Sequence, residues 1–415
     1  MTSSLPESKC PVFKGLKTLC LGLSGTILLV NKFLAEHGAT SIWVESATHV
    51  DIIRSSAPFY GGIVSPNRSA TAVSQGGSQL SMGINLRKPG AAEVVKRLAA
   101  WADVIGASWA PGALEKRGLG YDDLRKVNPN AIIINGSALG RGGTHGNLAA
   151  FGWAQQSLAG QIEYVGWPDR PGVGPPIAYP DFSAPWVITT AVVAALDYRR
   201  RTGKGQFVEF SQLESTFEFT PAHLILQYTA NRDIPTRQGN RASYAVPCGA
   251  FPCKGKDRWC AISVRNDAEW NGLCQTMSDQ PWTKDARFGT FLGRRKHEDE
   301  LETLIGTWTA RFTPHDVMMK LQQAGVPAGA VQKYDEILDK DPQFKHRKFF
   351  MKMSRPELEN ISHFSWPARL TGTPPDCRVT PRLGEHTEAI CHEILGMSDR
   401  EFGQLVADEV LELGV

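Results

Sequence analysis

The sequence has 415 residues, of which 42% are hydrophobic and 21% are charged, and its formal net charge is +3. A chain of this length can bury a large core, and we expect two or three structural units. Acidic and basic residues are dispersed along the chain and nearly balance each other, so the charge pattern predicts neither a nucleic-acid partner nor a membrane partner. Residues 1–9 are polar and resemble neither a signal peptide nor a membrane span, which predicts a cytoplasmic protein.

Eight cysteines are scattered along the chain without a Cys-X-X-Cys pair or a spacing typical of zinc ligands. The densest group is Cys248, Cys253 and Cys260, and it falls in a predicted β-hairpin at residues 246–264. Reduced thiols of a cytosolic protein are the simpler interpretation, with a metal site as the alternative for this group. We therefore expect no bound metal.

The first 140 residues alternate between predicted strands and helices. An apolar run broken by Gly22 and Gly25 is followed by a helical stretch, and strand–helix units of this kind recur along the chain. Such alternation implies parallel strands joined by right-handed crossovers. It predicts an open, doubly wound α/β sheet whose ligands lie outside the carboxyl ends of the strands. The predicted elements are a strand at 16–23, a helix at 27–37, a strand at 41–45, a helix at 92–101, a strand at 104–108, a short helix at 111–116 and a strand at 131–135.

Residues 140–180 are rich in glycine, proline and aromatic residues, which favours long irregular loops and a functional role. A well-marked helix follows at 181–201, with Asp181 predicted as its N-cap and Pro185 within its first turn. After this helix, the predicted elements are a strand at 206–210 and a helix at 213–228.

Composition changes near residue 231, and the next hundred residues carry the predicted hairpin and several charged helices. We assign them to a second, smaller domain. The tail holds proline-rich connections and predicted polar helices, and we expect it to return to the first domain. The predicted division is 1–230 for the N-terminal part of the large domain, 231–336 for the small domain and 337–415 for the returning segment. Within the small domain, helices are predicted at 267–277, 296–311 and 313–324.

Asp181 is the residue with the most informative position. A carboxylate at a helix N-cap is held by the free amides of the first turn, which favour its ionised form and prepare it to act as a nucleophile. From spacing alone, a purely capping role is the simpler interpretation. The segment from Gly22 to Gly25 could cradle an anion, but a tight turn explains it as well. Neither a GxGxxG fingerprint nor a P-loop lysine is present.

A series of short motifs follows in a specific order and spacing from about residue 13 to the C-terminus. They are Gly15-Leu-Lys, Leu34-Ala-Glu-His-Gly-Ala39, Asn85-Leu-Arg-Lys-Pro-Gly90, Pro111-Gly-Ala-Leu114, Gln156 with Gly160, Asp181, Thr202-Gly-Lys-Gly-Gln206, Gly239-Asn-Arg241, Gly325-Val-Pro-Ala-Gly329 and Leu383-Gly-Glu-His-Thr387. Together these motifs resemble those of the class III CoA-transferases, the CaiB/BaiF family of formyl-CoA, carnitine and benzylsuccinate CoA-transferases. The resemblance favours a nucleophilic role for Asp181 over capping alone.

This resemblance implies an enzyme that moves CoA from an acyl-CoA, such as succinyl-CoA, to a carboxylic acid. Asp181 is then expected to form mixed anhydrides and an aspartyl-CoA thioester. The expected fold is a Rossmann-like large domain with an inserted smaller α+β domain, in an interlocked dimer. CoA is a substrate, and no tightly bound cofactor is expected. By matching positions, the residues expected to line a CoA channel are Ser24, Gly25, Thr26, Trp109, Ala113 and Lys116, of which Lys116 reaches a phosphate.

Three positions depart from the pattern of the formyl-CoA enzyme. Gly25 stands where that enzyme has a glutamine near the reacting carbonyl, Ser46 where it has an arginine, and Gly152 where a carboxylate is common. These losses predict extra room, and nearby aromatic residues favour a bulky aromatic acid such as a benzylsuccinate. Ordinary packing of the aromatic residues is the alternative. They are Trp153, Trp167, Tyr179, Phe182 and Trp186.

The same losses leave other functions open. The chain fits a half-equipped or non-catalytic subunit of a heteromeric CoA-transferase with a paralogous partner, so a homodimer and a heteromer are both considered. A 2-methylacyl-CoA racemase shares the resemblance but needs a histidine near residues 151–153, and none stands there. A dinucleotide-binding dehydrogenase is disfavoured because no GxGxxG follows the first strand.

Overall fold

The computed structural model describes residues 5–22, 25–148, 150–219, 222–234 and 236–414. The chain packs into two compact units, and each is assembled from separate stretches of sequence. The first unit contains Met1–Ile162, Pro175–Ile234 and Lys345–Val415, and the second contains Glu163–Gly174 and Pro235–Phe344.

The first unit is built around one large sheet. Its strands are β1 (Lys17–Leu21), β2 (Thr40–Glu45), β3 (Leu80–Ile84), β4 (Val104–Ala107), β5 (Ile132–Ser137), β6 (Gln206–Ser211) and β12 (Leu411–Glu412). They lie in the order β12–β3–β2–β1–β4–β5–β6. Strands β1 to β6 run parallel, and β12 pairs antiparallel with β3. This is the strand order of a doubly wound sheet with its switch point between β1 and β4.

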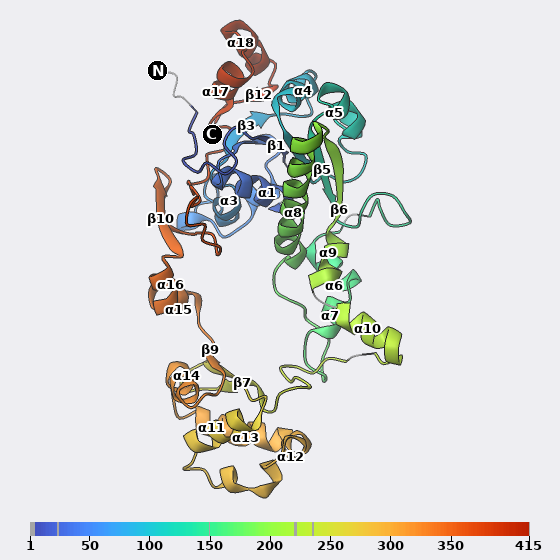
Figure 1. Cartoon of the computed structure of the whole chain (residues 1–415). Coiled ribbons are helices and arrows are strands. Elements are labelled where there is room, and N and C mark those ends of the chain that lie inside the picture. The colour runs from blue at the N-terminus through green and yellow to red at the C-terminus, as the bar shows by residue number, and fades with distance from the viewer. Residues whose placement is uncertain (1–4, 23–24, 149, 220–221, 235, 415) are drawn as a thin grey trace. The chain divides into compact units, whose positions relative to one another are not determined.

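Helices cover both faces of this sheet. The helices that the structure describes before residue 235, on the sheet or beyond it, are α1 (Gly25–Glu36), α2 (Ile52–Ser55), η1 (Tyr60–Gly62), α3 (Ala70–Gln75), α4 (Ala91–Trp101), η2 (Glu115–Arg117), α5 (Tyr121–Val127), α6 (Gly152–Leu158), α7 (Gln161–Tyr164), α8 (Tyr179–Thr202), α9 (Gln212–Phe219) and α10 (Ala222–Asn231). Side chains of β1 alternate between two cores: Leu19 and Leu21 join α4 and α5, whereas Cys20 joins α1 and α8. Helices α1 and α8 pack against each other (Figure 1). Burial of both faces explains the nearly continuous apolar runs of the strands.

Two regions differ from the sequence-based expectation. The stretch from 140 to 180, predicted to be irregular, contains α6 and α7. The tail, predicted to hold polar helices, also forms an antiparallel hairpin in which Phe350 lies opposite Phe364. The elements of the tail besides β12 are β10 (Phe350–Arg355), β11 (Leu358–Phe364), α17 (Thr387–Ala389), the π-helix η5 (Ile390–Ile394) and α18 (Asp399–Ala407).

The second unit combines a small antiparallel sheet with a group of helices. Its strands, in the order β7–β8–β9, are β7 (Cys248–Pro252), β8 (Trp259–Ser263) and β9 (Ala328–Ala330), and they enclose a hydrophobic core of their own. The predicted hairpin and the three predicted helices of this region are confirmed. The helices between residues 267 and 347 are α11 (Asp267–Thr276), η3 (Pro281–Lys284), η4 (Ala286–Phe288), α12 (Phe291–Lys296), α13 (Glu298–Thr309), α14 (Pro314–Gln323), α15 (Tyr334–Asp339) and α16 (Pro342–Arg347).

The predicted fold class, a doubly wound α/β domain with a smaller α+β part, is confirmed. The interlocked dimer and the division into residues 1–230, 231–336 and 337–415 stay predictions. Among the described residues, no helix combines the length and the apolar character that crossing a bilayer requires.

Close packing of α1 on the sheet generates a test of the fold. A Cβ at Gly106 in β4 would lie 2.5 Å from Ile27 Cγ2, whereas a Cβ at Gly136 in β5 would lie 3.6 Å from Ile27 Cδ1. We expect Gly106→Ala to destabilise the protein by about 1–3 kcal/mol through overpacking. Gly136→Ala is the matched control and is expected to change stability little. Equal thermal midpoints for the two variants would contradict this packing.

Candidate active site

The candidate site lies at the carboxyl ends of the central strands. β1 ends at Leu21, and α1 begins at Gly25 beside β4, so α1 starts at the switch point of the sheet. Ligands of doubly wound folds bind here, because the chain leaves neighbouring strands toward opposite faces and helix amides face the gap. Ser24, one of the predicted CoA-channel residues, lies outside the described residues.

Asp181 reaches this place from α8. The helix begins at Tyr179 with Ala178 as its N-cap, and Asp181 is the third helical residue. The prediction of Asp181 as the N-cap is therefore wrong. Pro180 suits a helical first turn, so the helix starts two residues earlier than expected, and Pro185 lies inside it.

Two uncharged side chains hold the Asp181 carboxylate through one oxygen. Gln212 Nε2 donates to Oδ1 at 2.6 Å, and Thr26 Oγ1 donates to the same atom at 3.3 Å. Gln212 Nε2 also donates to Thr26 Oγ1 at 2.8 Å, so the two partners hold each other. No residue that the structure describes donates to Oδ2. At this second oxygen, no donor from the described residues competes with a reacting group.

A second carboxamide orients Gln212. Gln155 Nε2 donates to Gln212 Oε1 at 3.2 Å and to the carbonyl oxygen of Ala150 at 3.1 Å. Because a carboxamide oxygen can only accept, this contact turns the amino group of Gln212 toward Asp181. Gln155 and Gln212 are both buried. Mutual packing of α6, α8 and α9 brings the three side chains together.

Burial raises the pKa of Asp181, and the hydrogen bonds from Gln212 and Thr26 counter part of the rise. The sequence predicted the opposite effect, an ionised form favoured by first-turn amides. That prediction is wrong because the carboxylate contacts buried side chains instead of the start of its own helix. A poorly hydrated carboxylate sheds little water before it attacks a carbonyl carbon, which favours nucleophilic chemistry.

Three of the predicted CoA-channel residues lie in the segment that follows β4. Trp109 Nε1 donates to the last carbonyl oxygen of β1 at 2.5 Å. This bond ties the segment to the strand that precedes Gly25 and Thr26, the other two described members of the set. Ala113 is half-buried, and Lys116 is exposed in η2. The structure thus brings Thr26 to Asp181 and Trp109 to the end of β1.

Two positions that were expected to provide extra room are filled by protein atoms. A Cβ at Gly25 would lie 2.2 Å from Gln75 Oε1, and a Cβ at Gly152 would lie 2.6 Å from both Cα and Cβ of Ala178. The third position, Ser46, is buried, and its hydroxyl accepts the backbone N–H three residues further on. The expectation of added space at Gly25 and Gly152 is therefore wrong, because neighbouring segments pack into both places.

The aromatic residues near Asp181 in sequence have different surroundings. Trp153 and Phe182 are 52% and 43% exposed. Trp186 meets the ring of Trp366 edge-on, with 5.0 Å between centroids, so part of this group serves ordinary packing. Trp167 belongs to the second unit.

Sequence reasoning missed the two glutamines that position the carboxylate. Gln212 directly follows the last residue of β6, and a polar residue at that point of a parallel strand is a detectable signal. Gln155 gave no such signal, because it stands in a stretch that was expected to be irregular.

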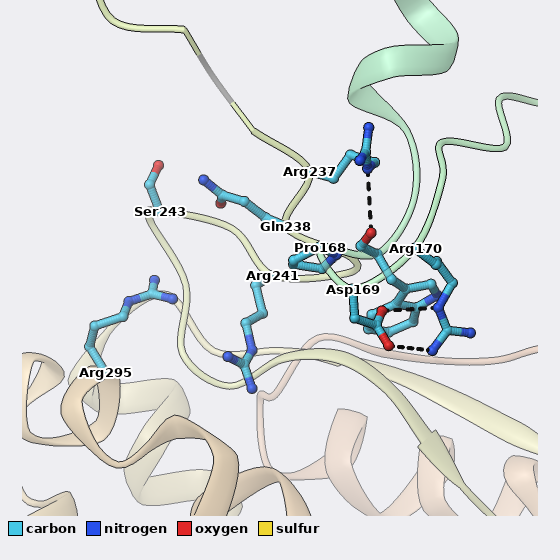
Figure 2. Close-up of a pocket in the computed structure, with 9 residues that line it drawn as sticks. Pro168, Asp169, Arg170, Arg237, Gln238, Arg241, Ser243 and Arg295 are labelled. Atoms are coloured by element: carbon cyan, nitrogen blue, oxygen red, sulfur yellow. Dashed lines mark hydrogen bonds and ion pairs between the residues drawn. The ribbon is translucent and has the colours of Figure 1, made fainter.

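A separate cavity of about 690 Å³ lies within the second unit (Figure 2). Four arginines line it, and each meets a carboxylate, so their charges are compensated. Gly239 donates from its backbone to the carbonyl oxygen of Gly166 at 2.9 Å, and a Cβ at Gly239 would lie 2.4 Å from the ring of Trp167. The cavity therefore marks the place where two stretches of this unit are tied together. The ion pairs join Arg170 to Asp169, Arg237 to Glu163, Arg241 to Glu298, Asp299 and Glu302, and Arg295 to Glu298.

Comparison with known proteins agrees with the resemblance seen in the motifs. The model of CoA-transferase family III matches residues 13–387. The chain is 31% identical over 332 residues, 80% of its length and 82% of the relative's, to succinyl-CoA–D-citramalate CoA-transferase of Chloroflexus aurantiacus. It is 26% identical to the beta subunit of succinyl-CoA–L-malate CoA-transferase of the same organism, over 99% of both chains.

A solved structure supports the same relationship. The crystal structure of a CaiB/BaiF family protein from Brucella suis matches with a TM-score of 0.84 and 26% identity. The match covers 94% of this chain and 100% of the other.

The raised pKa of Asp181 generates a test of its surroundings. A carboxyl whose pKa is raised on folding stabilises the fold below its unfolded pKa, and this stability is lost as the pH rises through the folded pKa. We therefore expect Asp181→Asn to have a higher thermal midpoint than the unmodified protein at neutral pH. The difference should shrink as the pH falls below the unfolded pKa of about 3.9, because the carboxyl is then protonated in both the folded and the unfolded state.

The matched control is Asp197→Asn, at an exposed position of the same helix. Ion pairs with Arg200 and Arg201 lower the pKa of Asp197. Its replacement should lower the midpoint slightly or leave it unchanged at neutral pH. A midpoint for Asp181→Asn below that of the unmodified protein at every pH would show that the carboxylate is not disfavoured by burial.

Proposed function

The chain belongs to CoA-transferase family III and is a class III CoA-transferase; from this premise we propose that Asp181 is the nucleophile that carries the acyl group. The observation that supports the proposal is the state of its carboxylate. One oxygen is held by Gln212 and Thr26, and no described residue donates to the other. The group stands at the switch point of the sheet, where the carbonyl of an acyl-CoA can approach the start of α1.

The proposed reaction uses the carboxylate of Asp181 in four steps. Its Oδ2 attacks the donor carbonyl carbon, the C–S bond breaks, and CoA leaves as the thiolate with the bonding electrons. The thiolate then attacks the aspartyl carbon of the mixed anhydride, which releases the donor acid and leaves an aspartyl-CoA thioester. The acceptor carboxylate attacks this thioester and expels the thiolate. Attack of the thiolate on the acceptor carbon of the second anhydride forms the product thioester and restores Asp181.

Water has to be excluded for these steps to end in transfer and not in hydrolysis. The groups around the carboxylate suit this requirement, because Gln155, Gln212 and Thr26 are buried and uncharged. Gln212 and Thr26 satisfy Oδ1, and Gln155 orients Gln212, without the hydration shell that a charged partner brings. The residues that we propose to hold CoA are those implied by the motif resemblance: Ser24, Gly25, Thr26, Trp109, Ala113 and Lys116.

For the substrates, we propose succinyl-CoA as donor and a short dicarboxylic acid as acceptor. The two relatives from Chloroflexus aurantiacus are named for succinyl-CoA together with D-citramalate or L-malate. The filled positions at Gly25 and Gly152 favour a small acceptor. A bulky aromatic acid such as a benzylsuccinate is the second candidate, and the half-exposed rings of Trp153 and Phe182 favour it.

The assembly proposed for the chain is an interlocked dimer, formed with a second copy or with a paralogous subunit. The name of one relative, a beta subunit, supports a heteromer. In a heteromer, the proposed role of Asp181 would make this chain a catalytic subunit, and a half-equipped or non-catalytic subunit is the alternative.

Replacement of Asp181 tests the nucleophile. Asp181→Ala is expected to lower kcat for CoA transfer by at least about 10³-fold, because no covalent intermediate can form. Asp197→Asn, the control on the same helix, should keep kcat within about twofold of the unmodified enzyme. Trapping with hydroxylamine followed by mass spectrometry should place the modification on the peptide that holds Asp181. Undiminished transfer by the Ala variant would rule the nucleophile out.

A panel of acceptors tests the substrate class. With succinyl-CoA as donor, we expect kcat/KM for short dicarboxylic acids such as malate and citramalate to exceed that for benzylsuccinate by about tenfold or more, a difference of about 1.4 kcal/mol in transition-state binding. Chromatography of the CoA esters measures the products, and the Asp181→Ala protein provides the uncatalysed background. A preference for benzylsuccinate would favour the aromatic candidate instead.

A further inference from the structure

Gln75 occupies the space beside the first residue of α1. A Cβ added at Gly25 would lie 2.2 Å from Gln75 Oε1, 3.1 Å from Cδ and 3.4 Å from Nε2. Gln75 is the last residue of α3, and α3 packs against α1. The carboxamide of Gln75 therefore takes the position that a side chain at Gly25 would fill.

Within the part of the chain that the structure describes, this carboxamide is buried without a hydrogen-bond partner. Gln75 is 5% exposed, and its Oε1 has no hydrogen-bond partner within the described part of the chain. Its Nε2 donates to none of the described residues either. Buried amides are satisfied in the great majority of folded proteins, so an orphan amide at a helix N-terminus points to a ligand.

The neighbouring Gln79 shows what a structural glutamine looks like in the same region. Its Oε1 accepts from Asn31 Nδ2 at 2.6 Å, and its Nε2 donates to two backbone carbonyl oxygens. Gln79 is buried to a similar degree as Gln75. Burial alone therefore does not explain the orphan amide.

The orphan carboxamide stands next to the residue that holds the nucleophile. Gly25 is followed by Thr26, whose hydroxyl donates to Asp181 Oδ1 at 3.3 Å. The first N–H groups of α1, a helix of 12 residues, have no partners within the helix and point toward this end. A carbonyl oxygen bound here has donors available from the helix and from Gln75.

We propose that Gln75 is a further residue of the acyl site and donates through Nε2 to the carbonyl oxygen of the acyl group that Asp181 attacks. This inference rests on the proposed role of Asp181. When the carboxylate adds to the carbonyl carbon, the π electrons move onto the oxygen. They return to the carbon when the C–S bond breaks. A donor at this oxygen stabilises the charge that develops between these two events.

Substitutions of Gln75 test the donor. Gln75→Ala is expected to lower kcat for CoA transfer about 10²-fold with KM for the acyl-CoA changed less than about threefold, because an oxyanion donor acts mainly in the transition state. Gln75→Glu keeps the size of the side chain, removes its N–H groups and should lose about as much activity. Gln79→Ala is the matched control. It should lower the thermal midpoint yet leave kcat of the folded enzyme within about twofold.

Gly25→Ala adds an independent measurement. Its methyl group collides with the carboxamide and should displace it, so kcat is expected to fall in the presence of Gln75. In the Gln75→Ala protein, Gly25→Ala should lower kcat little further, because the effects of two groups in contact are coupled. Additive losses would contradict a shared role.

Rapid-quench mass spectrometry of the Asp181 peptide separates the two proposals. If the enzyme with its natural sequence forms no acyl adduct on Asp181, the proposed role of Asp181 as nucleophile is wrong. If the adduct forms equally fast in the natural enzyme and in both Gln75 variants, the nucleophilic role of Asp181 is supported and the role of Gln75 is wrong. Adduct formation slowed about 10²-fold in both Gln75 variants, and unchanged in Gln79→Ala, supports the donor.

Discussion

The hydrogen bond from Gln212 to Asp181 is the contact on which the geometry of the site depends. It joins the start of α8 to the end of β6, two elements that approach each other only in the folded sheet. A buried carboxylate without a partner costs several kcal/mol, so the fold has to supply one. Gln155 fixes the direction of this donor by occupying the oxygen of Gln212. Three helices are thereby held in one arrangement around a single oxygen atom.

The choice of uncharged partners has a chemical consequence. An arginine or lysine at the same distance stabilises the ionised carboxylate, which lowers its pKa and makes it less basic. An amide and a hydroxyl satisfy Oδ1 while burial keeps the pKa raised. Among the residues that the structure describes, both hydrogen-bond partners of this carboxylate are uncharged. The carboxylate of Asp181 is therefore more basic than that of an exposed aspartate.

Local sequence patterns predicted the sheet well, because both of its faces are buried and most strands are apolar along their whole length. β3 was not predicted, since Ser81 and Gly83 interrupt its apolar run. The fold explains both residues. Ser81 Oγ donates to the buried carboxylate of Glu45, and a Cβ at Gly83 would lie 2.2 Å from the carbonyl oxygen of Glu412.

The sequence was sufficient to predict Asp181 as the central residue of the candidate site, but not the side chains that surround it. The motif order located Asp181, and the missing side chain at Gly25 was visible in the sequence. The glutamine that fills this space comes from a segment about fifty residues away, and no local pattern connects the two. Contacts between distant segments decide hydrogen bonding and pKa, so the raised pKa of Asp181 also required the structure.

The antiparallel strand β12 has a consequence for biosynthesis. β3 leaves the ribosome long before residues 411–412, which pair with it and complete this side of the sheet. During that interval the nascent chain exposes a row of unpaired backbone groups along β3, the kind of edge that recruits strands from other chains. Glu412 also accepts a hydrogen bond from the backbone of Ala47, next to β2. Pairing of residues 411–412 therefore covers a strand edge at which a partly folded chain is open to misassembly.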